Sequence, residues 1–160
     1  MKLTSPGFAD GSTIPTRFTC DGADRSPALT WQDSPSGTKA FALICDDPDA
    51  PGKTWVHWVT YDLPATLAEL PEGIEPTDQP PALNGGRQGI TDFRRVGYGG
   101  PCPPPGKPHR YFFTLYALDA ALGLDPKATK ADVERAMQGH ILGTAQLIGT
   151  YRRGGRAAHQ

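Results

Sequence analysis

The feature that most constrains the fold is a short apolar segment, Phe41 to Cys45, which runs directly into an acidic, proline-rich turn ending at Pro51. An apolar and partly β-branched run of this length is typical of a buried strand. Pro48 and Pro51 in the turn exclude a helix and withdraw two backbone donors. The segment therefore predicts a buried strand that ends at rigidly held carboxylates.

Two further strands are predicted, from Trp55 to Leu63 and from Arg110 to Leu118. Both faces of these segments are rich in apolar residues, as expected for strands in the middle of a covered sheet. Because successive side chains of a strand point to opposite faces, His57 should share a face with Trp55, and His109 should share one with Tyr111.

The remaining chain is dominated by turns and loops. Residues 1–40 predict turns and short strands, and Asp-Gly and Ser-Gly pairs punctuate them. The segment from Pro64 to Pro108 holds about half of all prolines and glycines, yet its aromatic and β-branched residues favour an ordered insertion. A short helix is expected around Ala120–Leu124.

One longer helix is predicted near the C-terminus. Thr129 is a candidate N-cap, with Asp132 as its capping-box partner. Apolar residues at helical spacing then continue from Val133 to Tyr151, which predicts one amphipathic helix ending near Gly154. This stripe is interpreted as core packing.

Length and charge favour one domain at residues 1–153 with a disordered tail at 154–160. The net charge of −1 provides no basic surface, which argues against nucleic acid as a partner. No apolar run reaches transmembrane length, so integral membrane association is not expected. Cys20, Cys45 and Cys102 are widely spaced and odd in number, which argues against a disulfide framework and predicts a reduced, cytoplasmic protein.

Several side chains that could bind a ligand or act in catalysis lie in or next to the rigid loops: Asp47, Asp49, His57 and His109. The Gly99–Gly106 loop is a further candidate. Taken singly, the aspartates could cap turns, and His57 could be a buried neutral imidazole. Two histidines, each beside aromatic residues and next to a proline-rich loop, instead favour a preorganised pocket.

Such a pocket suits an anion. Two imidazoles can donate hydrogen bonds, and the N–H groups of Gly99 and Gly100 could approach closely because no Cβ intervenes. Asp47 could hold one histidine protonated or accept a hydrogen bond from the ligand. We therefore expect a small phosphate-bearing ligand.

Metal binding and catalysis are the alternative uses of these residues. Asp47, Asp49, His57, Cys102 and His109 are all legitimate ligands, but none occurs at a recognised ligand spacing, so neither a metal nor a cofactor is expected. Acid–base hydrolysis by Asp47 with a histidine is chemically feasible. No serine or lysine is placed as a nucleophile, and no catalytic residue is assigned.

Several of these motifs together resemble the phosphatidylethanolamine-binding protein family. They are Asp47 to Pro51, Trp55 to Trp58, Gly100 to Gly106, and His109 to Tyr111, flanked by similar segments at Asp21–Trp31 and Met137–Tyr151. The likeness covers nearly the whole chain. The compact length and the Gly-Pro-Cys-Pro-Pro-Pro-Gly loop are similar to the bacterial and archaeal Raf-kinase-inhibitor-like branch.

The resemblance implies a mainly β fold: an antiparallel β-sandwich with a C-terminal helix and long Pro/Gly-rich loops. It also implies a small pocket for phosphate-type anions, and the Ala50–Pro51 bond becomes a candidate for the cis form. The implied ligand-binding residues are Asp47, Asp49, Ala50, Pro51, Trp55, His57, Gly100, Pro101, His109 and Tyr111. Of these, Asp49 could serve the loop rather than the ligand.

Three functions remain open at this point. The first is a non-catalytic binding protein for phosphorylated head groups or other small anions. The second is an inhibitor of a kinase or protease, acting through stiff proline loops. The third is a hydrolase that uses Asp47 with His57 or His109. The resemblance makes a homodimer one candidate assembly, because homodimers are common among prokaryotic members of that family, but the sequence itself does not specify the oligomeric state.

Overall fold

The computed structural model describes residues 1–154 and shows a mostly antiparallel β protein with one α-helix. Its larger sheet has five strands in the order β6-β4-β3-β7-β8, and all neighbouring strands are antiparallel. The strands are β3 (Ala40–Asp47), β4 (Trp55–Pro64), β6 (Arg87–Gln88), β7 (His109–Leu118) and β8 (Ile141–Tyr151). The three predicted central strands are β3, β4 and β7, so this expectation is confirmed.

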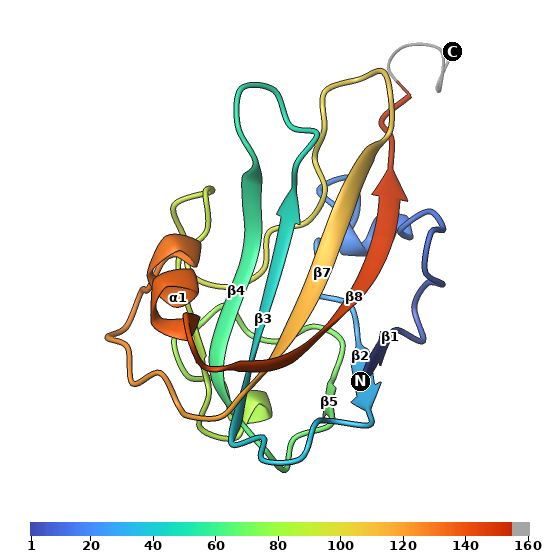
Figure 1. The fold of residues 1–160 in the computed structure, drawn as a ribbon. Coiled ribbons are helices and arrows are strands. Elements are labelled where there is room, and N and C mark those ends of the chain that lie inside the picture. Colours follow the sequence, from blue (N-terminus) through green and yellow to red (C-terminus); the bar gives the residue numbers. More distant parts are fainter. Residues whose placement is uncertain (155–160) are drawn as a thin grey trace.

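A smaller sheet packs on one face of the larger one, and a helix covers the other face beside β4 (Figure 1). The smaller sheet has the order β1-β2-β5, with β1 Lys2–Thr4, β2 Leu29–Gln32 and β5 Glu69–Leu70. The helix is α1 (Lys130–Met137), and short 3₁₀ helices occur at Thr16–Phe18 and Pro81–Leu83. The predicted antiparallel β-sandwich is confirmed.

The central strand β3 is apolar along its length because both of its faces are covered. Phe41 and Leu43 belong to the core between the two sheets, whereas Ala42 and Ile44 pack in a second cluster with Val133 of α1. All four of these β3 residues are at most 2% exposed. Removal of this much apolar surface from water is the main favourable contribution to the fold.

An irregularity in β4 determines which way its side chains point. Cys45 pairs with Trp58 and Asp46 pairs with Val56, so that His57 is an extra residue opposite β3. A bulge of this kind bends the strand and redirects a side chain. Val56 lies with Val59 on the helix side of the sheet, and Trp58 lies in the core between the sheets. His57 therefore lies on the same side of the sheet as Trp55, as predicted. Strict alternation would also place Val59 on that side, but Val59 lies on the opposite one.

The long C-terminal helix predicted from the apolar stripe is wrong beyond Met137. The capping box of Thr129 and Asp132 is confirmed, and α1 begins there. The chain then leaves the helix through Gly139, whose positive φ of 81° favours glycine, and continues as β8. Residues 145, 147, 149 and 151 of β8 face inward at the period of a strand. Because β8 carries apolar residues on both faces, their combined spacing also matches a helical period, which explains the incorrect helix prediction.

The cysteines also differ from the expectation. Cys20 and Cys102 form a disulfide across 82 residues of sequence, and Cys45 is a buried free thiol. An odd cysteine count does not exclude a bridge, because tertiary structure can bring two cysteines together and bury the third. The prediction of a reduced, cytoplasmic protein rested on unpaired cysteines and loses that support.

Residues 120–124 form no helix, and residues 1–154 contain no cis peptide bond, so Ala50–Pro51 is trans. The predicted disordered tail lies outside the described residues, apart from Gly154. No helix of the described chain is both long and apolar enough to cross a membrane.

Candidate functional site

A pocket of about 330 Å³ lies at the end of the larger sheet where β3 stops and where β4 and β7 begin. The β3–β4 loop and the loop that leads into β7 rise side by side at this end (Figure 1). The pocket is lined by Asp47, Ala50, Pro51, Trp55, His57, Phe93, Cys102, Pro103, Pro104, His109 and Tyr111. Antiparallel pairing brings these strand ends together, because Asp47 faces Trp55 across β3 and β4.

Asp47 and His109 form a buried pair at the base of this pocket. Oδ2 of Asp47 lies 2.6 Å from Nδ1 of His109, and Oδ1 accepts a hydrogen bond of 2.8 Å from the backbone N–H of Asp49. Asp47 is 3% exposed, so this carboxylate requires such partners. The carboxylate holds the His109 ring with Nδ1 protonated and directs Nε2 away from it.

His57 is anchored in the same way by a backbone carbonyl. Its Nδ1 donates a hydrogen bond of 2.6 Å to the carbonyl oxygen of Gly99, and the side chain is nearly fully buried. Burial lowers the pKa of His57 from its ordinary value, outweighing the carbonyl and the nearby carboxylate of Asp47. The ring is therefore neutral at pH 7, and its Nε2 can accept a hydrogen bond.

Tyr111 contributes its ring to the pocket wall. Its hydroxyl is buried and has no hydrogen-bond partner among the described residues. The ring packs edge-on against His57 at a centroid distance of 5.2 Å and stacks on His109 at 6.5 Å. Burial raises the pKa of Tyr111, so the group stays a neutral phenol that can donate a hydrogen bond.

The upper walls of the pocket are apolar. Trp55 packs against Phe93 at a centroid distance of 5.6 Å, and Phe93 also contacts His57 at 5.2 Å. Phe93 was not assigned to the site from the sequence, whereas Cys102, Pro103 and Pro104 were expected there only as part of the Gly99–Gly106 loop. The only sequence feature that could have indicated a role for Phe93 is the presence of aromatic and β-branched residues in the 64–108 insertion.

Asp49 belongs to the loop and not to the pocket lining. Both of its carboxylate oxygens lie 2.9 Å from the guanidinium of Arg110, and Oδ2 also accepts from the Arg110 backbone N–H. The side-chain hydrogen bond from Arg110 lowers the pKa of Asp49 to about 2. This pair ties the β3–β4 loop to the start of β7.

Gly100 and Pro101 do not form the pocket rim that was expected. The N–H of Gly100 donates to Oδ1 of Asp24, and the carbonyl of Pro101 accepts from the N–H of Cys20. The N–H of Gly99 donates to the carbonyl oxygen of His57 and is likewise occupied.

Close packing explains the glycine at position 100. A Cβ on Gly100 would lie 2.1 Å from the carbonyl oxygen of Phe18. The missing side chain therefore lets two backbone segments meet, rather than letting a ligand approach the backbone.

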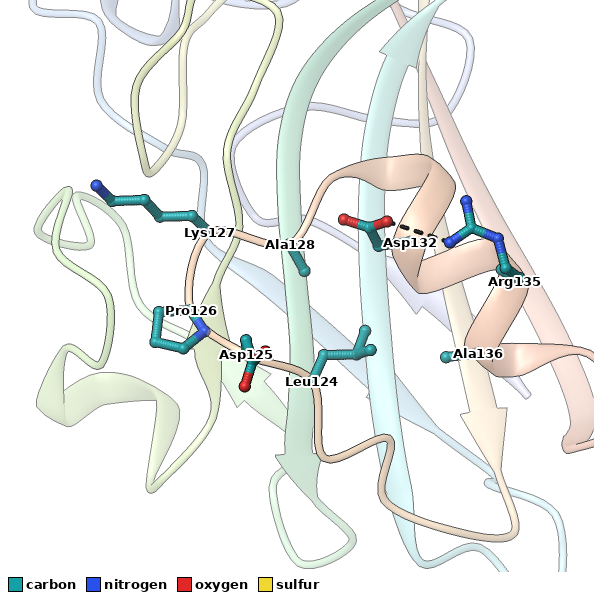
Figure 2. Close-up of a pocket in the computed structure, with 8 residues that line it drawn as sticks. All are labelled: Leu124, Asp125, Pro126, Lys127, Ala128, Asp132, Arg135 and Ala136. Carbon is teal, nitrogen blue, oxygen red and sulfur yellow. Dashed lines mark hydrogen bonds and ion pairs between the residues drawn. The ribbon is translucent and has the colours of Figure 1, made fainter.

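A second cavity, of about 380 Å³, lies between residues 124–128 and α1 (Figure 2). Its lining includes four charged residues, Asp125, Lys127, Asp132 and Arg135, of which Asp132 and Arg135 pair with each other at 3.3 Å near the surface. Asp132 also completes the N-terminal cap of α1. The first pocket is the stronger candidate, because two buried imidazoles line it and neither Nε2 has a hydrogen-bond partner among residues 1–154. Within residues 1–154, no cluster of three His, Cys, Asp or Glu is arranged to hold a metal ion.

Comparisons with known proteins agree with this fold. Residues 4–152 match the family model described as phosphatidylethanolamine-binding protein. The chain is 51% identical over 154 residues to a UPF0098 protein of Methanothermobacter thermautotrophicus, covering 96% of this chain and 100% of the relative. It is 52% identical over 155 residues to a UPF0098 protein of Aquifex aeolicus, covering 96% of this chain and 89% of the relative.

Two solved structures have the same architecture. A putative phosphatidylethanolamine-binding protein homolog from Chlamydia trachomatis superposes with a TM-score of 0.85 at 38% identity, covering 95% of this chain and 97% of that one. E. coli YbcL, described as a member of the mammalian PEBP family, superposes with a TM-score of 0.87 at 36% identity, covering 95% and 98%. The chain belongs to the phosphatidylethanolamine-binding protein family, in its bacterial and archaeal branch.

Proposed function

We propose that this protein is a non-catalytic binding protein whose pocket takes phosphate-bearing head groups or other small anions. One observation carries the proposal. His57 and His109 line the same pocket, each has its Nδ1 held by the protein, and neither Nε2 has a partner among residues 1–154. Two imidazole nitrogens fixed in this way form a preorganised recognition site.

The two rings favour an oxyanion that still carries a proton. Nδ1 of His109 lies against the Asp47 carboxylate, and whenever Nε2 also carries a proton it can donate to an anionic oxygen. Neutral His57 can accept from a P–O–H group. A phosphate monoester monoanion supplies both kinds of partner.

The dimensions of the pocket favour a head group over an acyl chain. Its volume of about 330 Å³ is at the small end for ligand sites. The aromatic walls formed by Trp55 and Phe93 can pack against the uncharged part of a small ester.

Titration with inorganic phosphate and with phosphoethanolamine tests the proposal. NMR signals of the His57 and His109 rings should shift, and His57→Gln should lose binding while remaining folded. His140→Gln is the matched control, because His140 pairs with Asp119 at 2.7 Å on an exposed turn away from the pocket. Unchanged ring signals at millimolar ligand would contradict the proposal.

An acid–base hydrolase is the second candidate, and the Asp47–His109 pair is the observation in its favour. In that reaction Nε2 of His109 would remove a proton from water while Asp47 stabilises the imidazolium. Assays with phosphate esters and amides test it, and turnover abolished by Asp47→Asn would support it. Inhibition of a kinase or protease remains a hypothesis based on the proline-rich loops.

A further inference from the structure

The disulfide lies at the edge of the proposed binding pocket. Cys102 lines the pocket together with Pro103 and Pro104, and its partner Cys20 follows the first 3₁₀ helix. Both bridged cysteines are exposed, whereas Cys45 is 1% exposed. A small dithiol can therefore reach the bridge without opening the core.

The chain before Cys102 is held by hydrogen bonds, but the wall segment after it is not. Gly100 donates to Asp24 at 2.8 Å, and the Pro101 carbonyl accepts from Cys20 at 3.1 Å. Between residues 102 and 105 no backbone hydrogen bond is made within the part of the chain that the structure describes.

The next backbone attachment of this wall is the N–H of Gly106, which donates to the Arg153 carbonyl at 3.2 Å. The disulfide is thus the attachment that precedes Pro103 and Pro104, which line the pocket. The floor of the pocket does not depend on it, because Asp47, His57 and His109 belong to the strands of the larger sheet.

Arg153 is placed to assist cleavage of the bridge. Its Nη1 lies 3.8 Å from Sγ of Cys102, and its Nη2 pairs with Asp21 at 3.1 Å. A guanidinium beside a sulfur stabilises the thiolate that leaves when the bridge is attacked. Attack at Cys20, with Cys102 as the leaving group, is the favoured direction.

We propose that the Cys20–Cys102 disulfide is a redox control of the pocket, which binds its anionic ligand tightly when the bridge is closed and weakly when a dithiol reductant has opened it. This inference rests on the proposed function of the same pocket. When the bridge is open, ligand binding must order residues 102–105, which costs conformational free energy. The closed bridge orders this segment before the ligand binds, so that this cost is not part of the binding free energy.

The chemistry balances with a dithiol as co-reactant. One thiolate of the dithiol attacks Sγ of Cys20, the S–S bond breaks, and Cys102 leaves as a thiolate that then takes a proton. The second thiol of the reductant attacks the mixed disulfide and releases Cys20 as a thiol. Two electrons pass to the protein, which gains two thiols, and the reductant becomes a disulfide.

Affinity for phosphoethanolamine is measured on the oxidised protein, on the protein reduced with dithiothreitol, and on the double variant Cys20→Ser/Cys102→Ser. Reduction should weaken binding about tenfold, and the double variant should match the reduced protein and ignore reductant. Alkylation should modify two thiols after reduction, since Cys45 is buried. Hydrogen exchange should accelerate at Gly106, whose N–H is bonded to Arg153, and stay unchanged in β3.

The outcomes separate this inference from the proposed function. No binding by the oxidised protein means that the proposed function itself fails. Equal binding by oxidised and reduced protein leaves that function intact and overturns the redox control, and global unfolding on reduction overturns it as well. If the double variant does not fold, the reduced and alkylated wild-type protein decides the question.

A kinetic measurement tests the assisting role of Arg153. Arg153→Gln should slow reduction by dithiothreitol several-fold, because the leaving thiolate loses its neighbouring charge. Arg152→Gln is the matched control, since Arg152 is an exposed neighbour on the same segment. Equal rates for the two variants would overturn attack at Cys20 with Cys102 as the leaving group.

Discussion

Oδ2 of Asp47 lies 2.6 Å from Nδ1 of His109, although 62 residues separate them in the sequence. Asp47 is the last residue of β3, and His109 is the first residue of β7. The two strands are antiparallel neighbours, so the end of one meets the start of the other. Sheet pairing therefore creates the buried carboxylate–imidazole pair that orients one half of the candidate site.

Replacement of Asp47 by asparagine should weaken phosphoethanolamine binding by about 10- to 100-fold, because a charge-assisted hydrogen bond that orients His109 is lost. Calorimetric titration measures this change. Asp46→Asn is the matched control, because Asp46 pairs with Lys130 at 2.6 Å, outside the pocket lining. Equal losses in both variants would contradict the orienting role of Asp47.

The lowered pKa of His57 makes stability depend on pH. Below the ordinary value of 6.5, the unfolded chain binds a proton at this residue while the folded protein does not. The free energy of unfolding should therefore fall as pH decreases from 6.5 towards the folded pKa, by up to about 1.4 kcal/mol per pH unit from this group.

Urea unfolding at pH 7.5, about 6.5 and about 5.5 measures this slope. His57→Gln should show a shallower loss of stability than the wild type over this interval. Identical slopes in the variant and the wild type would show that burial of His57 does not govern the dependence.

Phe93→Ala should lower both stability and affinity. The ring makes edge contacts with Trp55 and His57, and two such pairs contribute about 1–3 kcal/mol to folding. Ligand affinity should fall several-fold because His57 loses the ring that packs against it. Phe112→Ala is the matched control: Phe112 lies on the helix side of the sheet, and its loss should leave affinity unchanged.

Met137→Ala should destabilise the protein without affecting the pocket. Met137 is 2% exposed and packs in the cluster beneath α1, so truncation should cost about 2–4 kcal/mol of unfolding free energy. Thermal and denaturant unfolding report the loss. The folded variant should bind phosphoethanolamine with the same affinity as the wild type. A parallel loss of affinity would show that the cluster beneath α1 and the pocket are coupled.

The local sequence determined much of the fold. The β3, β4 and β7 strands follow from apolar, β-branched segments bounded by turn residues, and the cap of α1 follows from Thr129 and Asp132. These features depend on neighbouring residues only. The motif residues Asp47, His57 and His109 could likewise be selected as candidates from their residue types and the loops beside them.

The identity of β8 could not be predicted in the same way. Its apolar residues fit a helical and a strand period at once, and only pairing with β7 decides between them. The Cys20–Cys102 bridge is also invisible to local reasoning, because it depends on where two distant loops meet.

The amino-acid sequence alone thus determined the strand-rich character of the chain and the residue types available for anion recognition. Tertiary structure decided how those residues are used. The bulge at His57 turns its ring into the pocket. The N–H groups of Gly99 and Gly100 donate to other groups of the protein, and Asp49 ties the β3–β4 loop to Arg110. Side-chain direction and hydrogen-bond partners depend on strand register and loop contacts, which no local pattern specifies.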